Sequence, residues 1–487
     1  MNSPVQRDSS DVRSFDLVVL GGGPAGTCAA GTAAVFGRRV ALVEKELEVG
    51  GAGVLSGTVP SKTLRETALA LSGWRSRKLF GVDLSLRREA TVADFTRHQQ
   101  QVSAGESQRL ATRLQTLAVE RFYGTASFVD AHTVRVQRNN GPDLTLRGDK
   151  ILIATGSSPF RPPAFPFDDD RVHDSDELLH LRALPKRLVV IGAGVIGSEY
   201  ACTFAAMGVD VHLVDGRDSL LPFLDGEISR ALAAAMAAGG VKFHWSENVT
   251  NCDARDPGEV RLTLSSGAAL GCDHVLVCSG RSSNTSQLNL AAAGLAPGKR
   301  GIIPVGADYC TSIGHIYAAG DVIGAPALAA TSMEQARVAV CHAFEITAKA
   351  DLTSLLPTGI YTIPEISMVG ETEESLKTKG IQFIAGRARY AENPRGRIIG
   401  DETGFLKLLF RHDDLRLLGV HVIGEQATEI VHTGLMAMLM EAGADLFNRA
   451  CFNYPTLGDL YKYATYDAIL QRQRSGERPY SKTIRVD

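Results

Sequence analysis

The chain lacks a strong charge of either sign and a long apolar run, and each absence removes a class of protein. Its 51 Lys and Arg residues nearly balance 54 Asp and Glu residues, for a formal net charge of −3, which argues against nucleic acid as a partner. The most basic stretch, "GWRSRKLFG" (73–81), is typical of the exposed face of a helix. No apolar run approaches the roughly 18 residues that a membrane span needs. The polar N-terminus lacks a signal-peptide core, so we expect a cytoplasmic protein.

Paired cysteines are also missing. None of the eight cysteines lies in a C-x-x-C pair, and without metal-ligand spacing they predict no metal site and buried, reduced thiols. The glycine-rich stretch "GGAGVLSGTVPSK" (50–62) contains no cysteine, histidine or acid, and its polar side chains are three hydroxyls and Lys62. This loop therefore holds no redox nucleophile.

What is present begins with a glycine motif in a specific context. The stretch "FDLVVLGGGPAGTCAAGTAAVFGRRVALVEK" (15–45) gives an apolar strand, then Gly21-x-Gly23-x-x-Gly26, a small-residue helix and a second strand that ends at Glu44. The acid follows the last glycine by 18 residues, close to the spacing of a dinucleotide site. The glycines would let the backbone approach a pyrophosphate at a helix N-terminus, and Glu44 would accept hydrogen bonds from ribose hydroxyls.

A second copy of this pattern occurs 171 residues later. It gives Gly192-x-Gly194-x-x-Gly197, with Asp215 again 18 residues after the last glycine. Two such units predict two dinucleotides. Between them, "KILIATGSSP" (150–159) predicts a strand with a small-residue turn, and "IYAAGDVIG" (316–324) predicts a strand that ends at Gly320-Asp321. This aspartate would bond a polyol or phosphate arm, or alternatively would cap the following helix.

The rest of the chain predicts a mixed architecture. Helices are expected at 61–80 and 91–120, and a small β-meander at 121–148 with a hairpin at "RNNGPD". From about 357 the pattern changes to an α+β domain, with strands at 397–410 and 416–424 and helices at 427–442 and 456–470. The fold class is therefore α/β, with two Rossmann-like dinucleotide-binding domains and a C-terminal α+β domain.

These pieces, in this order, resemble the flavoprotein disulfide reductases from about Phe15 to about Leu470. The resemblance implies FAD and NAD(H) or NADP(H) as cofactors and a homodimer. It also implies a division of the chain, with a disordered tail at 1–14, an FAD domain at 15–160 and 286–356, an NAD(P) domain at 161–285, and a dimerisation domain at 357–487.

The sequence lacks both the redox disulfide of this family and the acid–base pair that serves it. The family carries its redox disulfide in the pattern GGTCxNxGCxPSK, where this chain has Gly53 and Thr58. The family's His-Pro-Thr and following Glu, an acid–base pair for the thiols, are replaced by Tyr454 and Asp459 in "FNYPTLGDL". Thiol chemistry and its proton shuttle are therefore both absent, and the loop becomes a scaffold beside the flavin.

One branch of the family matches better. The stretches "GTVPSKTLRETALAL" and "FNYPTLGDLYKYA" resemble the soluble, Si-specific pyridine nucleotide transhydrogenases, although these usually keep the first cysteine. This branch implies that hydride passes from NAD(P)H through the flavin to a second nicotinamide. Two alternatives stay open: reduction of a quinone, as in the thiol-free NAD(P)H:quinone reductases, and a non-catalytic flavin-binding redox sensor.

The resemblance also implies a set of site residues. Lys62 would lie beside the reactive edge of the flavin and pair with Glu199. The catalytic set is Lys62, Glu199, Tyr454 and Asp459. The FAD set is Gly21, Gly23, Gly26, Glu44, Lys45, Gly51, Thr58, Lys62, Thr155, Gly156, Gly320 and Asp321. The NAD(P) set is Gly192, Gly194, Val195, Ile196, Gly197, Glu199, Asp215, Arg217 and Gly280.

The choice of coenzyme is contested within the second motif. Asp215 would bond a free 2′-hydroxyl and repel a 2′-phosphate. Arg217, two residues later, could attract that phosphate. A transhydrogenase must tolerate both nucleotides, whereas a plain NADH oxidoreductase needs only the aspartate.

Overall fold

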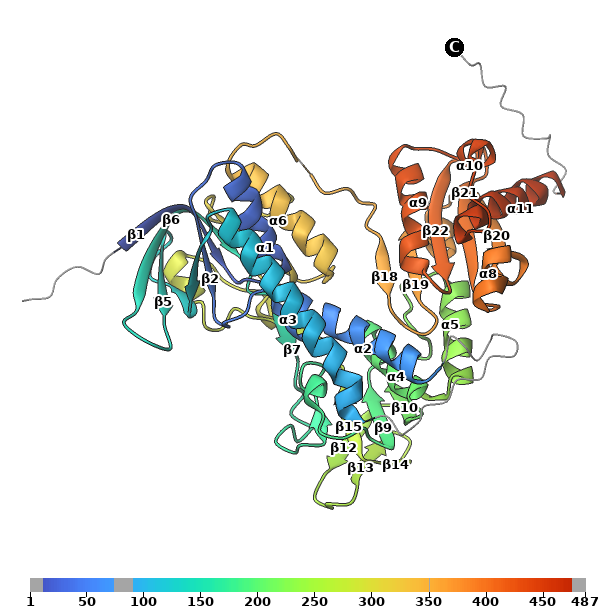
Figure 1. The fold of residues 1–487 in the computed structure, drawn as a ribbon, viewed down its shortest axis with the longest axis horizontal. Helices are drawn as coiled ribbons and strands as arrows, with labels where there is room; N and C mark the ends of the chain where they lie inside the picture. Colours follow the sequence, from blue (N-terminus) through green and yellow to red (C-terminus); the bar gives the residue numbers. More distant parts are fainter. Residues whose placement is uncertain (1–11, 74–90, 350, 475–487) are drawn as a thin grey trace, which may run out of the picture.

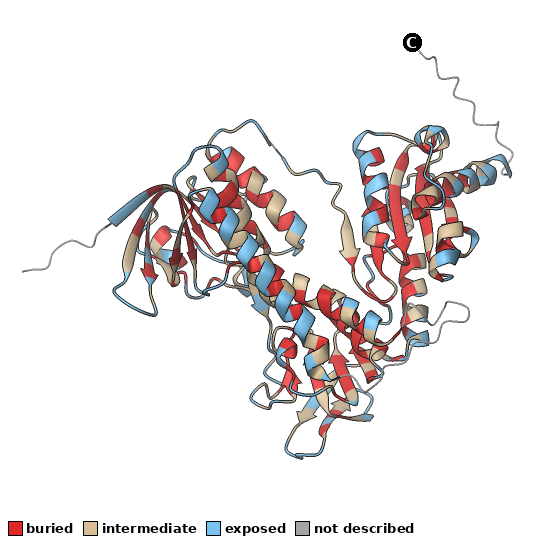
Figure 2. Ribbon diagram, in the orientation of Figure 1, coloured by how far each residue is buried: buried red, intermediate tan, exposed pale blue. Residues whose placement is uncertain are grey.

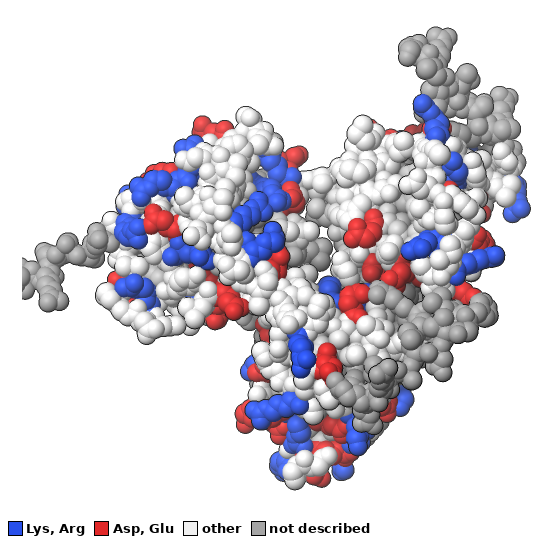
Figure 3. All heavy atoms as spheres, viewed as in Figure 1, with Lys and Arg blue, Asp and Glu red and all other residues white. Residues whose placement is uncertain are grey.

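The computed structural model describes residues 12–73, 91–349 and 351–474. The chain forms three lobes, each built around one larger sheet (Figure 1). The space-filling view shows the surface hollowed between the first and third lobes, with acidic and basic side chains interspersed (Figure 3). Most of the basic stretch at 73–81 lies outside the described residues. Within them, no helix has the length and apolar character needed to cross a bilayer.

The first lobe holds a seven-stranded sheet in the order β3-β2-β1-β6-β5-β4, with β17 beside β6. Its parallel strands are β1 (Val12–Leu20), β2 (Val40–Glu44), β3 (Glu120–Tyr123), β6 (Leu144–Ile153) and β17 (Ile316–Ala318). The antiparallel strands β4 (Thr125–Phe128) and β5 (Thr133–Gln137) complete the predicted meander. Helices α1 (Pro24–Val35) and α6 (Ala329–Ala343) pack together beside this sheet (Figure 1), because α1 buries mainly alanine and glycine.

The second lobe is inserted into the first. The chain leaves through β7 (Ser157–Pro159) and returns through β16 (Arg281–Ser283), and these two strands pair antiparallel. Its parallel sheet has the order β11-β10-β9-β15-β8, with strands β8 (Val172–His173), β9 (Arg187–Ile191), β10 (Asp210–Asp215), β11 (Val241–Trp245) and β15 (His274–Val277). Its further elements are α4 (Val195–Ala206), α5 (Gly226–Ala238), β12 (Val249–Asp253), β13 (Val260–Leu264) and β14 (Ala269–Cys272).

The third lobe is an antiparallel sheet covered by helices (Figure 1). Its strand order is β18-β19-β22-β21-β20, with β18 (Thr358–Ile360), β19 (Ile366–Gly370), β20 (Phe383–Arg389), β21 (Phe405–Arg411) and β22 (Leu417–Ile423). Its helices are α7 (Glu373–Thr378), α8 (Pro394–Ile399), α9 (Ala427–Leu439), α10 (Ala444–Arg449) and α11 (Leu460–Arg474).

The lobes are joined by a shared apolar core. Helices α2 (Thr58–Leu71) and α3 (Val92–Thr116) run from the first lobe onto the second. One continuous cluster of buried side chains contains Leu64 of α2, Leu188 of β9 and Ile360 of β18, one residue from each lobe. Figure 2 shows the buried residues concentrated on the strands and on the inner faces of these helices. Burial of this shared core fixes the lobes relative to one another.

A buried ion cluster also joins the second and third lobes. The side chain of Lys407 on β21 is 1% exposed, and its Nζ lies 2.7 Å from Asp225, 3.0 Å from Glu227 and 2.7 Å from Glu373. Burial alone would lower the pKa of Lys407, but hydrogen bonds to these carboxylates raise it above its ordinary value. The ammonium therefore stays charged and holds α5 against the third lobe.

Three expectations about the chain need correction. The strand predicted at 397–410 begins only at Phe405, because Asn393 caps α8 through the N–H groups of Arg395 and Gly396 and Pro394 opens that helix. Residues 12–14 of the predicted tail belong to β1 and pair with β6. Cys451 is exposed, whereas the other seven cysteines are buried or half-buried, and all eight are free thiols.

Candidate functional site

The first glycine motif lies where β1 ends and α1 begins. A Cβ on Gly26 would overlap the carbonyl oxygen of Gly21, so the helix approaches the strand turn as closely as a glycine allows. Glu44 ends the neighbouring strand, and its carboxylate accepts hydrogen bonds from the N–H groups of Gly22 at 2.6 Å and Glu46 at 3.0 Å. The motif therefore forms a cradle with a fixed acid beside it, and this geometry fits a dinucleotide.

Other predicted residues gather at the same edge of the sheet. Because β1, β6 and β17 are parallel, their carboxyl ends lie together. Thr155 follows β6 and donates to the carbonyl of Asn284 at 2.8 Å. Asp321 follows β17 and accepts a hydrogen bond from Ser157 at 2.9 Å. The capping alternative for Asp321 is wrong, because α6 begins eight residues later with Leu328 as its N-cap.

The glycine-rich loop covers this first motif. The N–H of Gly50 donates to the carbonyl of Gly22 at 2.8 Å. The loop continues as a π-helical turn, Ala52–Ser56, in which a Cβ on Gly53 would overlap the ring of Pro24. Thr58 opens α2 and is exposed. The position that resembles the family's first redox cysteine therefore has no room for a side chain.

The second glycine motif repeats the geometry of the first without a cover. A Cβ on Gly197 would overlap the carbonyl oxygen of Gly192, and the N–H of Ala193 donates to Asp215 at 2.6 Å. Val195 and Ile196 form the first turn of α4, whereas a Cβ on the N-cap Gly194 would meet no atom within 4 Å. This motif also fits a dinucleotide, and its face is open.

Asp215 and Arg217 neutralise each other. The guanidinium of Arg217 donates to both carboxylate oxygens of Asp215, at 2.8 and 2.7 Å. Burial alone would raise the pKa of Asp215, but hydrogen bonds from Arg217 and from the N–H of Ala193 hold it below its ordinary value. The two groups that compete in the choice of coenzyme are therefore bonded to each other.

Lys62 and Glu199 come together from different lobes, although 137 residues separate them in the sequence. Nζ of Lys62, on α2, lies 2.7 Å from Oε2 of Glu199, on α4, and the Glu199 side chain is only 7% exposed. The other carboxylate oxygen accepts the N–H of Tyr361 at 2.9 Å. The third lobe therefore contributes to the pair through Tyr361, which sequence reasoning missed because a backbone N–H leaves no sequence signature.

Tyr454 and Asp459 lie elsewhere on the chain. Tyr454 belongs to the third lobe and is 74% exposed, and Asp459 ends a short 3-10 turn, Leu457–Asp459. Among the described residues, neither side chain forms a hydrogen bond or ion pair with Lys62 or Glu199. Their role in the site therefore stays a prediction.

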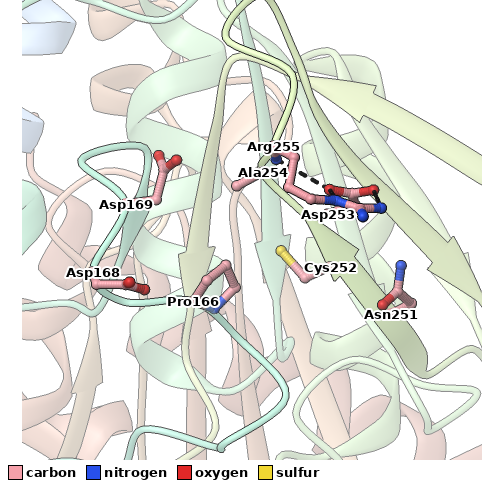
Figure 4. A pocket seen from close by; sticks show the side chains of 8 residues that line it. All are labelled: Pro166, Asp168, Asp169, Asn251, Cys252, Asp253, Ala254 and Arg255. Carbon is pink, nitrogen blue, oxygen red and sulfur yellow. Dashed lines mark hydrogen bonds and ion pairs between the residues drawn. The ribbon is translucent and has the colours of Figure 1, made fainter.

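A surface hollow of about 400 Å³ in the second lobe lies apart from both motifs (Figure 4). Two of its three lining carboxylates are already paired, Asp169 with Arg171 and Asp253 with Arg255. Burial raises the pKa of the Cys252 thiol to about 11, so it is protonated at neutral pH. This hollow shares no residue with the predicted sites and carries no chemistry of its own.

Known proteins are similar to this chain over most of its length. Residues 15–342 match the family described as pyridine nucleotide-disulphide oxidoreductase, and residues 356–465 match the dimerisation domain of that family. A protein of Mycobacterium tuberculosis named soluble pyridine nucleotide transhydrogenase is 44% identical over 94% of this chain and 98% of its own. A protein of the same name from Aliivibrio fischeri is 38% identical, over 95% and 99% respectively.

Solved structures agree with the fold. LpdA from Mycobacterium tuberculosis superposes with a TM-score of 0.86 at 26% identity, covering 93% of this chain and 99% of its own. The HOCl-induced flavoprotein disulfide reductase RclA from Escherichia coli gives 0.82 at 26% identity, covering 92% and 99%. Members of this family use FAD and NAD(P)H, as the two glycine motifs predict. The chain belongs to the pyridine nucleotide-disulphide oxidoreductase family.

Proposed function

We propose that the chain is an FAD-dependent enzyme that exchanges hydride between two nicotinamide nucleotides. The observation that carries this proposal is the pair of complete dinucleotide cradles, bridged by Lys62 and Glu199, beside a loop that has neither a thiol nor room for one. The curated relatives named soluble pyridine nucleotide transhydrogenase support it.

The first lobe would hold FAD. Gly21, Gly23 and Gly26 would form the cradle for the pyrophosphate, Glu44 would accept hydrogen bonds from the ribose, and Asp321 would bond the polyol or phosphate arm. When bound, FAD supplies a carrier that takes hydride from one nicotinamide and returns it to another. The ammonium of Lys62 would then stabilise negative charge on the reduced ring. We therefore assign FAD to this lobe, with the predicted bounds 15–160 and 286–356.

The second lobe, assigned to 161–285, would hold the nicotinamide nucleotide at Gly192, Gly194 and Gly197. The Asp215–Arg217 pair suits both coenzymes, since the aspartate can bond a 2′-hydroxyl and the arginine can bond a 2′-phosphate. Because Gly53 is packed against Pro24, the loop would close the side of a bound flavin that lies beside it. Donor and acceptor nucleotides would therefore use the open side in turn.

The proposal includes a homodimer formed through the third lobe, which carries the family's dimerisation domain. Several large apolar side chains of this lobe are exposed on the single chain: Met436, Leu439, Met440, Tyr454, Tyr463, Tyr466 and Leu470. A second copy of the chain would cover them, because isologous two-fold pairing is the commonest assembly. Tyr454 and Asp459 would then face the flavin of the partner. As the relatives are named soluble, we place the enzyme in the cytoplasm.

The test is a transhydrogenation assay with purified, FAD-loaded protein. NADPH and thio-NAD⁺ are supplied together, and thio-NADH is followed by its absorbance. We expect ping-pong kinetics in which each nucleotide competes with the other for one site. Fast reduction of a benzoquinone with no formation of thio-NADH would replace this proposal with the quinone reductase. Light scattering at micromolar concentration tests the dimer, and a monomeric mass would contradict it.

A further inference from the structure

Tyr361 touches both members of the Lys62–Glu199 pair. It follows β18 directly, in the third lobe. Its N–H donates to Oε1 of Glu199 at 2.9 Å, while Oε2 of the same carboxylate accepts from Lys62 at 2.7 Å. Nζ of Lys62 also lies 5.1 Å from the centre of the Tyr361 ring. One residue of the third lobe therefore holds the carboxylate from one side and faces the ammonium from the other.

The aromatic ring is suited to this position. A ring face attracts an ammonium group at this distance, and more strongly where water is partly excluded. Burial raises the pKa of the Tyr361 phenol above its ordinary value, so the side chain stays neutral near pH 7. It therefore does not become a second anion that competes with Glu199 for Lys62.

Arg65 ties the same helix to the same segment. It follows Lys62 by three residues, so both side chains leave one face of α2. Arg65 is only 3% exposed, and its Nε donates to the carbonyl of Thr362 at 3.0 Å. Its guanidinium also lies 3.6 Å from Glu365. These two contacts of Arg65 hold the turn of α2 that carries Lys62 against residues 361–365.

The segment itself is anchored to α9. One carboxylate oxygen of Glu365 accepts both the N–H of Thr428 at 2.8 Å and its hydroxyl at 2.7 Å. Thr428 lies in the first turn of α9, the helix that carries the exposed Met436 and Leu439. A continuous chain of contacts therefore runs from α9 through 361–365 to Lys62.

We propose that Tyr361 is a positioning residue that holds the ammonium of Lys62 against Glu199, with its backbone N–H fixing the carboxylate and its ring covering the cation. The inference deepens the proposed function, because it explains how Lys62 is held in place for the flavin. It also gives the third lobe a part in the active site of its own chain, separate from any contact across a dimer.

The test is peptide-resolved labelling of lysines with an amine-reactive ester, on the FAD-loaded protein and on the protein stripped of FAD. Lys377 of α7, whose side chain is 63% exposed, is the internal reference. In Tyr361→Leu we expect the Lys62:Lys377 labelling ratio to rise roughly two- to tenfold, the range expected for loss of a cation–aromatic contact. Tyr361→Phe keeps the ring and should match the wild type. Glu199→Gln, which breaks the ion pair, is the positive control.

An unchanged ratio in Tyr361→Leu would overturn the proposal, and so would an equal rise in Tyr361→Phe. If Tyr361→Leu does not fold, Tyr361→Met keeps a large apolar side chain without an aromatic face and gives the same two outcomes. Melting temperature and the labelling rate of Lys377 separate a local change at Lys62 from a general loosening of the structure. The labelling needs no turnover, so the proposed function can fail in the transhydrogenation assay while this inference stands or falls separately.

Discussion

The two glycine motifs share one backbone plan and differ in what lies over them. In both, the last glycine touches the carbonyl of the first, and the acid accepts the N–H of the residue after the first glycine at 2.6 Å. Over the first motif, the loop at 50–57 is bonded through Gly50 and packed through Gly53. Over the second, Gly194 faces open space. A covered cradle suits a group that stays bound, whereas an open cradle suits one that exchanges.

The acids differ as well. Glu44 accepts hydrogen bonds from two backbone N–H groups, which leaves a fixed negative charge suited to one kind of ribose. Asp215 is neutralised by Arg217. The pair can open toward either a hydroxyl or a phosphate, so under the proposed function the second cradle would accept both coenzymes, whereas the first would select one kind of ribose.

The largest effect is expected from the matched substitutions Gly26→Ala and Gly197→Ala. Each places a methyl group against a backbone carbonyl that cannot move aside, at a cost of about 3 kcal/mol or more. Gly26→Ala should yield protein without bound flavin. Gly197→Ala should retain flavin and lose its reduction by NADH, as seen by absorbance in stopped flow. Loss of flavin in Gly197→Ala, or retention of flavin in Gly26→Ala, would contradict the assignment of flavin to the first motif alone.

Gly53→Cys tests the cover itself. The new side chain meets the Pro24 ring and should destabilise the loop by about 1–3 kcal/mol, which weakens FAD binding measured by fluorescence titration. No lipoamide or glutathione disulfide reduction should appear, because Thr58 and Tyr454 remain. Gly194→Ala is the control at the open motif, where stability should change by no more than about 1 kcal/mol. Equal loss of FAD in both variants would refute the role of the cover.

Asp215→Asn and Arg217→Gln each remove one charge of the Asp215–Arg217 ion pair in the second glycine motif. The first frees Arg217 and should shift the ratio of kcat/KM toward NADPH by roughly 1–3 kcal/mol. The second frees Asp215 and should shift the ratio toward NADH. Initial rates with both coenzymes measure each shift. If both variants move the ratio in the same direction, the second nucleotide site has been placed wrongly.

The last prediction concerns the dependence of stability on pH in the second lobe. The second lobe holds two histidine pairs, His173–His274 and His212–His244, each joined at 2.8 Å. Burial lowers the pKa of all four, that of His173 to about 4 from an ordinary 6.5.

The unfolded chain therefore takes up protons first as the pH falls. Stability is full above about pH 6.5 and declines toward pH 4, by on the order of 2–3 kcal/mol for His173. Melting temperatures across this range should fall less steeply in His173→Gln. A parallel decline in both proteins would contradict this assignment.

Much of this molecule could be predicted where local chemistry decides the structure. The glycine spacings predicted both cradles, and the alternation of strands and helices predicted two parallel sheets. Both signals lie within about 30 residues of sequence, so local chemistry was enough to reveal them. The helix α8 was missed, since Ile398 and Ile399 favour a strand while the decisive signal was the cap at Asn393. Arg65 carried a usable signal: it lies one turn from Lys62 on a predicted helix, on the same face.

Other features could not be reached from the sequence. The contact of Gly53 with Pro24 depends on how tightly a loop folds over a motif 29 residues away. The bond from the Tyr361 N–H to Glu199 joins residues 162 positions apart and uses an atom that every residue except proline has. Such contacts depend on the packing of the lobes, which local propensity does not determine.

The pairing of β7 with β16 makes the second lobe a cassette. Because the chain enters and leaves through adjacent strands, Ser157–Pro159 and Arg281–Ser283, another unit could replace the second lobe at a single junction. A replacement would have to reproduce the apolar face that the second lobe presents to α2 and β18. It would also have to supply partners for Lys62 and Lys407, which Glu199, Asp225 and Glu227 provide here. The covalent junction between the lobes is therefore simple, and the packing between them limits which unit can be inserted.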